Sequence, residues 1–205
     1  MVRRFVLLLS IAIFLCGTAA FLVARSFTFV SDSATPQSVV CKTGDVLKSD
    51  FESVEDGFAA AFPCTPVRTT STASTPFGNI TIVRYESEVD GVNYAVSFVD
   101  YANLVPGGEL PALVINFIID GAKRGVLRSA HMDNPTYTDI KLGNYIGQSI
   151  LASNAEQTLR GNVYIVGKST YQIVLTLPND YHDPSTADKF LNSFRVVDRQ
   201  KPPSN

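Results

Sequence analysis

Few side chains in this sequence have types and spacings that could do chemistry, and the cysteines are the first to consider. Cys16 lies in an apolar N-terminal run, which leaves Cys41 and Cys64 as an even pair. In an oxidising compartment such a pair predicts a disulfide. Free buried thiols are the alternative, because a metal site would need further ligands that no local spacing supplies.

The segment Gly167-Lys168-Ser169-Thr170 shares its residue types with the end of a phosphate-binding loop. Such a loop needs a glycine five positions before Gly167, where this chain has Asn162. It also needs a helix to follow, whereas Tyr171 to Leu175 has the pattern of a strand. We therefore expect a hairpin turn at this segment.

The two histidines, His131 and His182, are the remaining candidates for metal binding. His131 follows a predicted helix, where a polar or cationic group suits the carboxyl end. His182 lies between Asp180 and Asp183 and could share a metal ion with them, but Asp183 is better explained as a helix N-cap. We predict no catalytic, cofactor-binding or metal-binding residue, and the sequence favours a non-catalytic protein.

The first 24 residues predict export. Arg3-Arg4 precedes an uncharged apolar run from Phe5 to Ala24. Gly17 to Ala20 could form a signal-peptidase site. The run is also long enough to cross a bilayer, at roughly 1.5 Å per residue and roughly 30 Å of hydrocarbon. We favour the anchor, because a cleaved chain would begin with exposed apolar residues.

The expected location follows from the positive flank, which stays in the cytoplasm. The protein is then a single-pass protein of the cytoplasmic membrane, with its C-terminal domain outside the cytoplasm. A secreted or periplasmic protein is the alternative if the leader is cleaved. The formal net charge is −2 and no Lys/Arg cluster occurs, so nucleic acid is excluded as a partner.

The rest of the chain divides into three parts. Residues 25–50 are rich in Ser, Thr, Asp and Pro and predict a flexible tether. Residues 51–198 form one globular domain, and residues 199–205 form a disordered tail. The domain opens with a strand that ends at Pro63.

Strand patterns fall in two groups, each of which predicts an antiparallel meander. The first group includes Asp90-Gly91, a hairpin-turn pair, and Glu86 and Glu88 are expected to face solvent. The second group contains turns at Gly143-Asn144 and Gly167-Lys168. The predicted strands are Val67 to Ser74, Gly78 to Glu88, Val92 to Tyr101, Thr136 to Leu142, Tyr145 to Ser153, Gln157 to Val166 and Thr170 to Leu177.

Two helices complete the domain. The first, Pro111 to about Ala130, has an apolar stripe and leaves Asp120 and Lys123 on its exposed side. The second begins at Asp183-Pro184. Because each helix is apolar on one side, the fold class is α+β, an antiparallel β-sheet with flanking helices. The stripe comprises Leu113, Val114, Phe117, Ile118, Ala122 and Val126, and the second helix buries Phe190, Leu191 and Phe194.

The two ends of the domain carry a family resemblance. Asp56-Gly57-Phe58 with Phe62-Pro63-Cys64-Thr65-Pro66 resembles the start of PsbP-like exported bacterial proteins of unknown role. Lys189 to Val196 is similar to that family's terminal helix. The resemblance spans about Phe51 to Val197 and implies the PsbP-type α/β/α sandwich, with non-catalytic accessory or binding roles. No functional residue carries over, and nothing matches the segments with which PsbP engages photosystem II.

These patterns together predict a non-catalytic extracytoplasmic domain, associated with the membrane through its N-terminal segment. We expect an accessory or assembly factor that binds another protein, and a small-ligand or lipid-binding module is the alternative. A protein-binding factor should expose an apolar patch or groove, whereas a ligand carrier should enclose an apolar pocket between sheet and helix. An enzyme would bring together polar side chains with perturbed ionisation.

Overall fold

The computed structural model describes residues 39–42, 47, 49–75, 78–105, 107–183 and 185–199. The predicted leader, residues 1–24, and most of the predicted tether lie outside these ranges. Within the described ranges, no helix combines the length and the hydropathy that are needed to span a membrane.

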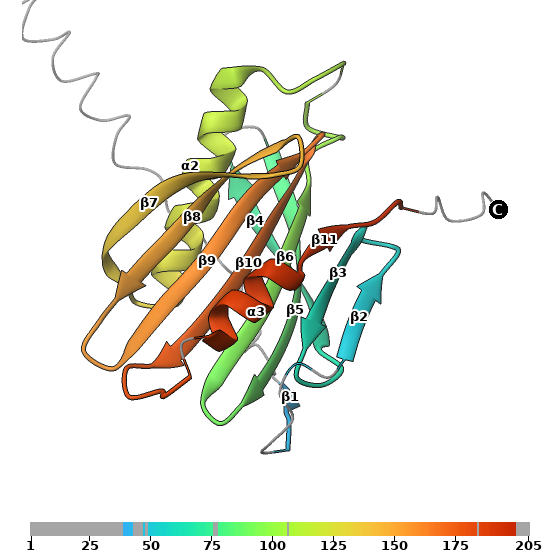
Figure 1. Ribbon diagram of the computed structural model, residues 1–205. Coiled ribbons are helices and arrows are strands. Elements are labelled where there is room, and N and C mark those ends of the chain that lie inside the picture. Colours follow the sequence, from blue (N-terminus) through green and yellow to red (C-terminus); the bar gives the residue numbers. More distant parts are fainter. Residues whose placement is uncertain are drawn as a thin grey trace, which may run out of the picture. The chain divides into compact units, whose positions relative to one another are not determined.

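A sheet of eight strands organises the described domain, in the order β1-β5-β6-β10-β9-β8-β7 (Figure 1). All neighbours are antiparallel except β1, which runs parallel to the end of β5, and β4 pairs with the rest of β5 on the same side. The strands are β1 (Val39–Val40), β4 (Val67–Thr75), β5 (Gly78–Val89), β6 (Val92–Asp100), β7 (Asp133–Leu142), β8 (Tyr145–Ser153), β9 (Gln157–Val166) and β10 (Ser169–Pro178).

The strand predicted to end at Pro63 belongs to a second, smaller sheet. This is β3 (Phe58–Phe62), which pairs with β2 (Ser49–Ser53) on one side and with β11 (Arg195–Val196) on the other. Its partners come from the two ends of the domain, so it does not belong to the first meander. The strand β1 and the start of β2 lie within the range predicted as a tether.

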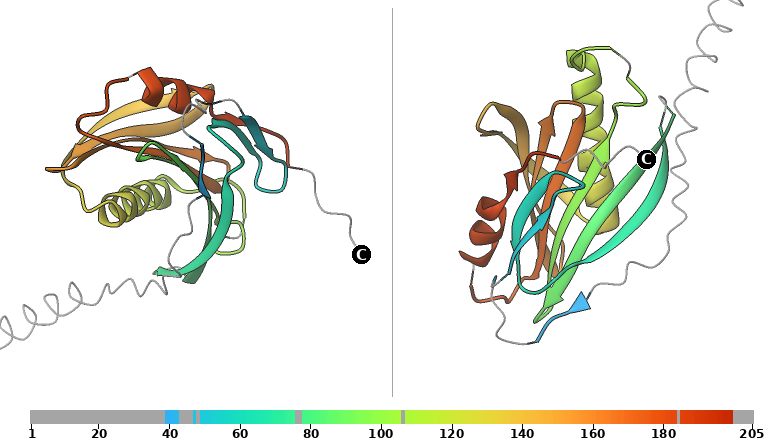
Figure 2. Two further views of the ribbon diagram at one scale, coloured as in Figure 1. Left: turned by 90° about the horizontal axis from the view of Figure 1, so that it is seen from below. Right: turned by 90° about the vertical axis from the view of Figure 1, so that its right-hand side faces the viewer.

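The two helices pack on opposite faces of the main sheet, α2 (Ala112–Ser129) on one and α3 (Ser185–Ser193) on the other, as the left view of Figure 2 shows. Ala122 and Val126 of α2 pack with residues of β8, β9 and β10. The smaller sheet lies on the α3 side, where Phe58 packs with Phe190 and Phe194. The α+β class predicted from the sequence is therefore confirmed.

The buried side of α2 begins later along the helix than predicted, and it also includes Ile119. Ile118, Ala122 and Val126 are buried, but Leu113 in the first turn is 82% exposed. Lys123, which we expected on the exposed side, keeps only 12% of its side-chain surface in water. Its ammonium forms an ion pair with Asp120 at 2.8 Å and donates a hydrogen bond to Gln148 of β8 at 2.8 Å. The periodicity locates the buried side of a helix but cannot show how far the covering sheet extends.

Local signals at turns and caps are confirmed. Asp90 and Gly91 both have positive φ, as a tight hairpin turn requires, and Gly143 and Gly167 open two further turns. Asp183 caps α3, because its carboxylate accepts hydrogen bonds from the backbone N–H of Ser185 and the hydroxyl of Thr186. These bonds lower the pKa of Asp183.

Candidate functional site

Cys41 and Cys64 form a disulfide, as the sequence predicted. Their Cα atoms lie 5.9 Å apart, and Cys41 is 8% exposed. The backbone N–H of Cys41 donates to the carbonyl of Glu88 at 2.6 Å, which continues the pairing of β1 with β5. The bond therefore joins the segment before β2 to the segment after β3, and it fixes where the chain enters the domain.

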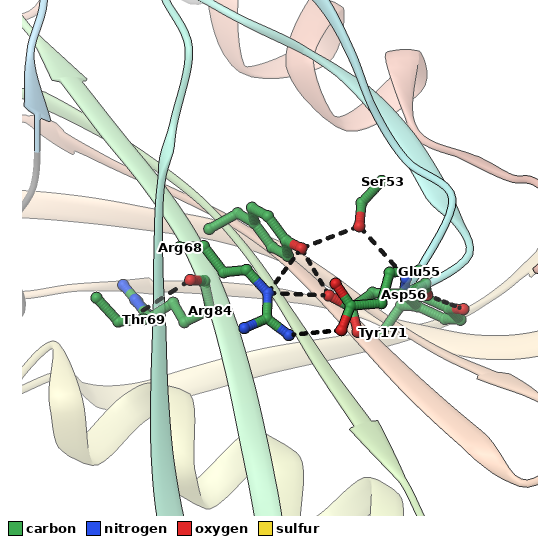
Figure 3. A network of polar contacts seen from close by, with 8 residues as sticks. Ser53, Glu55, Asp56, Arg68, Thr69, Arg84 and Tyr171 are labelled. Carbon is green, nitrogen blue, oxygen red and sulfur yellow. Dashed lines mark hydrogen bonds and ion pairs between the residues drawn. The ribbon is translucent and has the colours of Figure 1, made fainter. Parts of the chain in front are cut away.

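A network of polar contacts connects the turn between β2 and β3 to the main sheet, and Figure 3 shows the part of it around Ser53, Asp56 and Arg68. We call it the polar joint, and its centre is the buried carboxylate of Asp56, which is 4% exposed. The hydroxyl of Tyr85 donates to this carboxylate at 2.6 Å, and Arg68 Nε lies 3.4 Å from the same oxygen. The joint consists of Ser53, Asp56, Arg68, Tyr85, Tyr171 and Arg199.

The hydroxyl of Tyr85 forms hydrogen bonds with Ser53, Asp56 and Arg68. Besides donating to Asp56, its oxygen lies 2.9 Å from Ser53 Oγ and accepts a hydrogen bond from Arg68 Nε at 3.1 Å. Burial, and then the bond to Asp56, raise the pKa of Tyr85. The phenol therefore stays neutral at physiological pH, and it is not activated as a base or a nucleophile.

The second half of the joint brings in the C-terminal segment. The hydroxyl of Tyr171 donates to the backbone carbonyl of Asp56 at 2.8 Å, and Arg199 donates to that hydroxyl oxygen at 3.3 Å. Arg199 also forms an ion pair with Asp100 at 2.8 Å and lies 4.4 Å from the ring centre of Phe98. Arg199 falls in the range predicted as a disordered tail, but its guanidinium contacts Tyr171, Asp100 and Phe98.

Gly57 allows the turn between β2 and β3 to lie close to Arg199 and Tyr171. It has φ of +74°, and a Cβ at this position would lie 2.7 Å from Cγ of Arg199. A larger residue would meet both a strained backbone and a steric clash. The joint therefore depends on a glycine, and its arrangement indicates a structural connection between the two sheets.

Next to the joint lies an open depression of about 360 Å³. Its charged residues are Asp100, Lys168, Asp198 and Arg199. Lys168 Nζ donates to the carbonyl oxygens of Val105 and Gly107, so its charge holds the loop after β6 in place. With Arg199 paired to Asp100, the cations of the depression already have structural partners.

The aromatic part of this depression is formed by Tyr145 and Tyr171. Burial raises the pKa of Tyr171, although Arg199 opposes this shift. Tyr145 is 38% exposed and lies at the start of β8. The depression thus offers an open surface with mixed charge, without a base and a nucleophile placed within reach of each other.

Glu86 is buried, which contradicts the expectation that it faces solvent. It is 5% exposed, and Arg84 binds both of its carboxylate oxygens, at 2.9 and 3.0 Å. Asn93 donates a further bond at 2.6 Å. Although burial alone would raise the pKa of Glu86, the bonds from Arg84 and Asn93 lower it. The pair lies on one face of β5 and β6, and both charges are satisfied.

Large apolar side chains at the surface gather on the hairpin formed by β7 and β8. Tyr137 is 41% exposed, Ile146 43% and Leu151 50%. The β7–β8 register places Tyr137 and Ile146 on the α2 side of the sheet, whereas Tyr145, which is 38% exposed, and Leu151 lie on the α3 side. We call these four exposed residues of the hairpin the hairpin surface. The sequence analysis missed it, because the alternation of β8 identifies a strand without showing which part of its faces the helices leave uncovered.

The remaining candidates from the sequence lie apart from one another. Gly167 and Lys168 form the predicted turn between β9 and β10, so they do not precede a helix. His131 directly follows α2 with φ of 53°, and both His131 and His182 are exposed. Among the described residues, no three His, Cys, Asp or Glu side chains lie close enough together to hold a metal ion.

Comparison with known proteins adds no relative. No protein-family model matches this chain, and neither a curated protein nor a solved structure matches it. The fold and the surface described above therefore carry the functional argument.

Proposed function

We propose that this chain is a non-catalytic extracytoplasmic accessory or assembly factor, associated with the membrane through its N-terminal segment, that binds another protein. The observation that carries the proposal is the hairpin surface, where four large apolar side chains are exposed on two neighbouring strands. Apolar residues scattered singly need no explanation, whereas these four are concentrated on one hairpin, two on each of its faces, and such a concentration is typical of an interaction site.

The chemistry of the other sites agrees with a binding role. In the polar joint and in the Arg84–Glu86 pair, the buried charges have partners, and Tyr85 is held in its neutral form. A small-ligand or lipid carrier would need an enclosed apolar pocket. The depression beside the joint is open and contains four charged side chains, so it supports protein binding better than lipid binding.

The disulfide and the N-terminal sequence support the proposed location. A bond between Cys41 and Cys64 suits an oxidising compartment, and Arg3-Arg4 before the apolar run orients the following domain outward. Helices on opposite faces of an antiparallel sheet also agree with the PsbP-type α/β/α sandwich. We therefore propose that the domain is PsbP-like.

The test compares affinity capture by the intact protein with capture by surface variants from the same membranes. The double variant Tyr145→Ser/Leu151→Ser removes apolar area from the hairpin surface and should lose a specific partner. Leu113→Ser, which alters an even more exposed apolar residue of α2, is the control and should keep that partner. Capture of identical proteins by all three forms would contradict the proposal.

A further inference from the structure

The strand β7 forms one margin of the main sheet, and the described elements supply a partner, β8, on one side only. The helices pack mainly on strands other than β7, α2 on β8, β9 and β10, and α3 on β3, β9 and β10. In Figure 1 no other labelled element lies beyond β7. Within the described part of the chain, the outer backbone groups of β7 therefore have no strand partner and can accept another strand.

The turn between β7 and β8 determines which backbone groups point outward. It contains two residues, Gly143 and Asn144, with Gly143 at φ of 58°, so Leu142 and Tyr145 close the hairpin as a hydrogen-bonded pair. Every second residue of β7 then bonds to β8. The N–H and C=O groups that remain at the outer edge belong to Tyr137, Asp139 and Lys141.

The same edge carries two opposite charges. Asp139 and Lys141 are exposed and flank Ile140, and they share the face of Tyr137, whose ring lies 4.3 Å from Nζ of Lys123 in α2. Oδ1 of Asp139 accepts one bond from Gln148 at 2.8 Å. Within the described residues, Lys141 has no hydrogen bond or ion pair.

We propose that β7 pairs in antiparallel orientation with β7 of a second copy of this chain, about a two-fold axis at Ile140. In this register Asp139 of each copy lies opposite Lys141 of the other, and directly opposite residues in a sheet are neighbours on one face. Each of these pairs joins outward-pointing backbone groups, so it can also exchange both backbone hydrogen bonds.

The neighbouring registers are disfavoured by like charges. An axis at Asp139 places this carboxylate opposite its own copy, and an axis at Lys141 does the same for the ammonium. The other end of the strand limits the pairing, because the β7–β8 register shifts between Asp133 and Thr136, next to Pro135. About an axis at Ile140, the end of β7 at Leu142 sets the other limit, so the self-complementary segment is 138–142.

A dimer of this kind goes beyond the proposed function and does not depend on it. Because the axis is perpendicular to the sheet, the same faces of both copies lie on the same side. The two hairpin surfaces then become adjacent, and a partner could contact both. An interface built on one strand edge is small, so the association is weak and is best measured by cross-linking.

The first test uses single cysteines in the full chain, with Cys16→Ser in every variant and the protein kept in its membrane. Ile140→Cys places a thiol opposite its own copy in a non-hydrogen-bonded pair, where Cα atoms are about 4.5 Å apart, and it should form a disulfide-linked dimer on mild oxidation. Thr138→Cys, displaced from the axis, is the matched control and should give at least about tenfold less dimer.

The second test uses the charges in the same Ile140→Cys background. Asp139→Lys and Lys141→Asp should each lower the dimer yield several-fold, because each variant places like charges opposite each other. Co-expression of the two single variants restores opposite charges and should restore the yield. Asp133→Lys, the same charge change outside the paired segment, should leave the yield unchanged.

Two results would overturn the proposal. One is a cross-linking maximum at another position of β7, or no dimer at Ile140→Cys in protein whose circular dichroism shows the native fold. The other is a yield at Ile140→Cys that does not respond to the charge variants. Loss of partner capture by the hairpin variants affects neither test, so the two proposals can fail separately.

Discussion

Replacing Tyr85 with phenylalanine removes one oxygen atom from the centre of the polar joint and leaves the ring in place. The lost hydroxyl donates to Asp56 at 2.6 Å and accepts from Arg68 at 3.1 Å. Asp56 is 4% exposed, so water cannot replace the missing donor without local opening. The variant therefore retains a buried carboxylate that has lost its shortest hydrogen bond.

A hydrogen bond to a charged group contributes about 1.5–3 kcal/mol, and an unsatisfied buried partner adds to the loss. We expect Tyr85→Phe to lower the free energy of unfolding by about 2–3 kcal/mol. At about 2–4 °C per kcal/mol for a domain of this size, the melting temperature should fall by about 5–10 °C. Because the pKa of Tyr85 is raised above 10, its hydroxyl keeps its proton, and the loss should be equal at about pH 6 and about pH 8.

The assay is urea unfolding and thermal melting, followed by circular dichroism on the disulfide-intact protein. Tyr137→Phe is the matched control, because Tyr137 is 41% exposed and its ring contact with Lys123 survives the change. The control should stay within about 0.5 kcal/mol of the parent. Equal stability of the two variants would refute the conclusion that the joint holds the two sheets together.

Three further predictions test the interior. Because the pKa of Glu86 is lowered in the folded protein, ionised Glu86 stabilises the fold above its ordinary pKa of 4.5, and this stabilisation is lost as the pH falls through the lowered pKa. Glu86→Gln should therefore have a lower melting temperature than the parent at pH 7, and the difference in melting temperature should close towards about pH 3. The exposed control Glu156→Gln should show no gap at either pH. Gly57→Ala should lower the free energy of unfolding by about 1–3 kcal/mol, because of backbone strain and the clash with Arg199. Gly121→Ala, where a Cβ on α2 meets open space, should raise it by up to about 1 kcal/mol, and the opposite order of melting temperatures would contradict the clash at Gly57. Ile118→Ala should cost about 2–5 kcal/mol and Leu113→Ala less than about 0.5 kcal/mol, and equal midpoints in urea would show that the buried side of α2 is misassigned.

The features that the sequence predicts well are those determined by neighbouring residues. Asp90, Gly91 and Gly143 define their turns through positive φ values, and Asp183 caps its helix through bonds to residues that follow it closely. The strand patterns between the turn residues predicted the bounds of β8 and β9 to the residue. These signals act over a few positions, so no knowledge of the tertiary structure is needed.

The features that the sequence could not predict depend on distant partners. The strand β3 leaves the main sheet because β11, from the other end of the domain, pairs with it. Glu86 is buried because Arg84 and Asn93 neutralise it on a face that alternation alone would assign to solvent. The polar joint unites residues from separate segments, with Asp56 and Tyr171 separated by 115 positions. The hairpin surface likewise depends on where the helices stop covering the sheet.

The proposal that the hairpin surface binds another protein can be tested most directly with a photo-cross-linking amino acid placed at Leu151 in the intact chain, in its native membrane. Leu151 is 50% exposed on β8, and Leu113 on α2, 82% exposed, is the control position. The account predicts a discrete cross-linked product with a different protein from position 151 and none from position 113. Products that are identical at both positions, or no product with another protein at position 151, would contradict it.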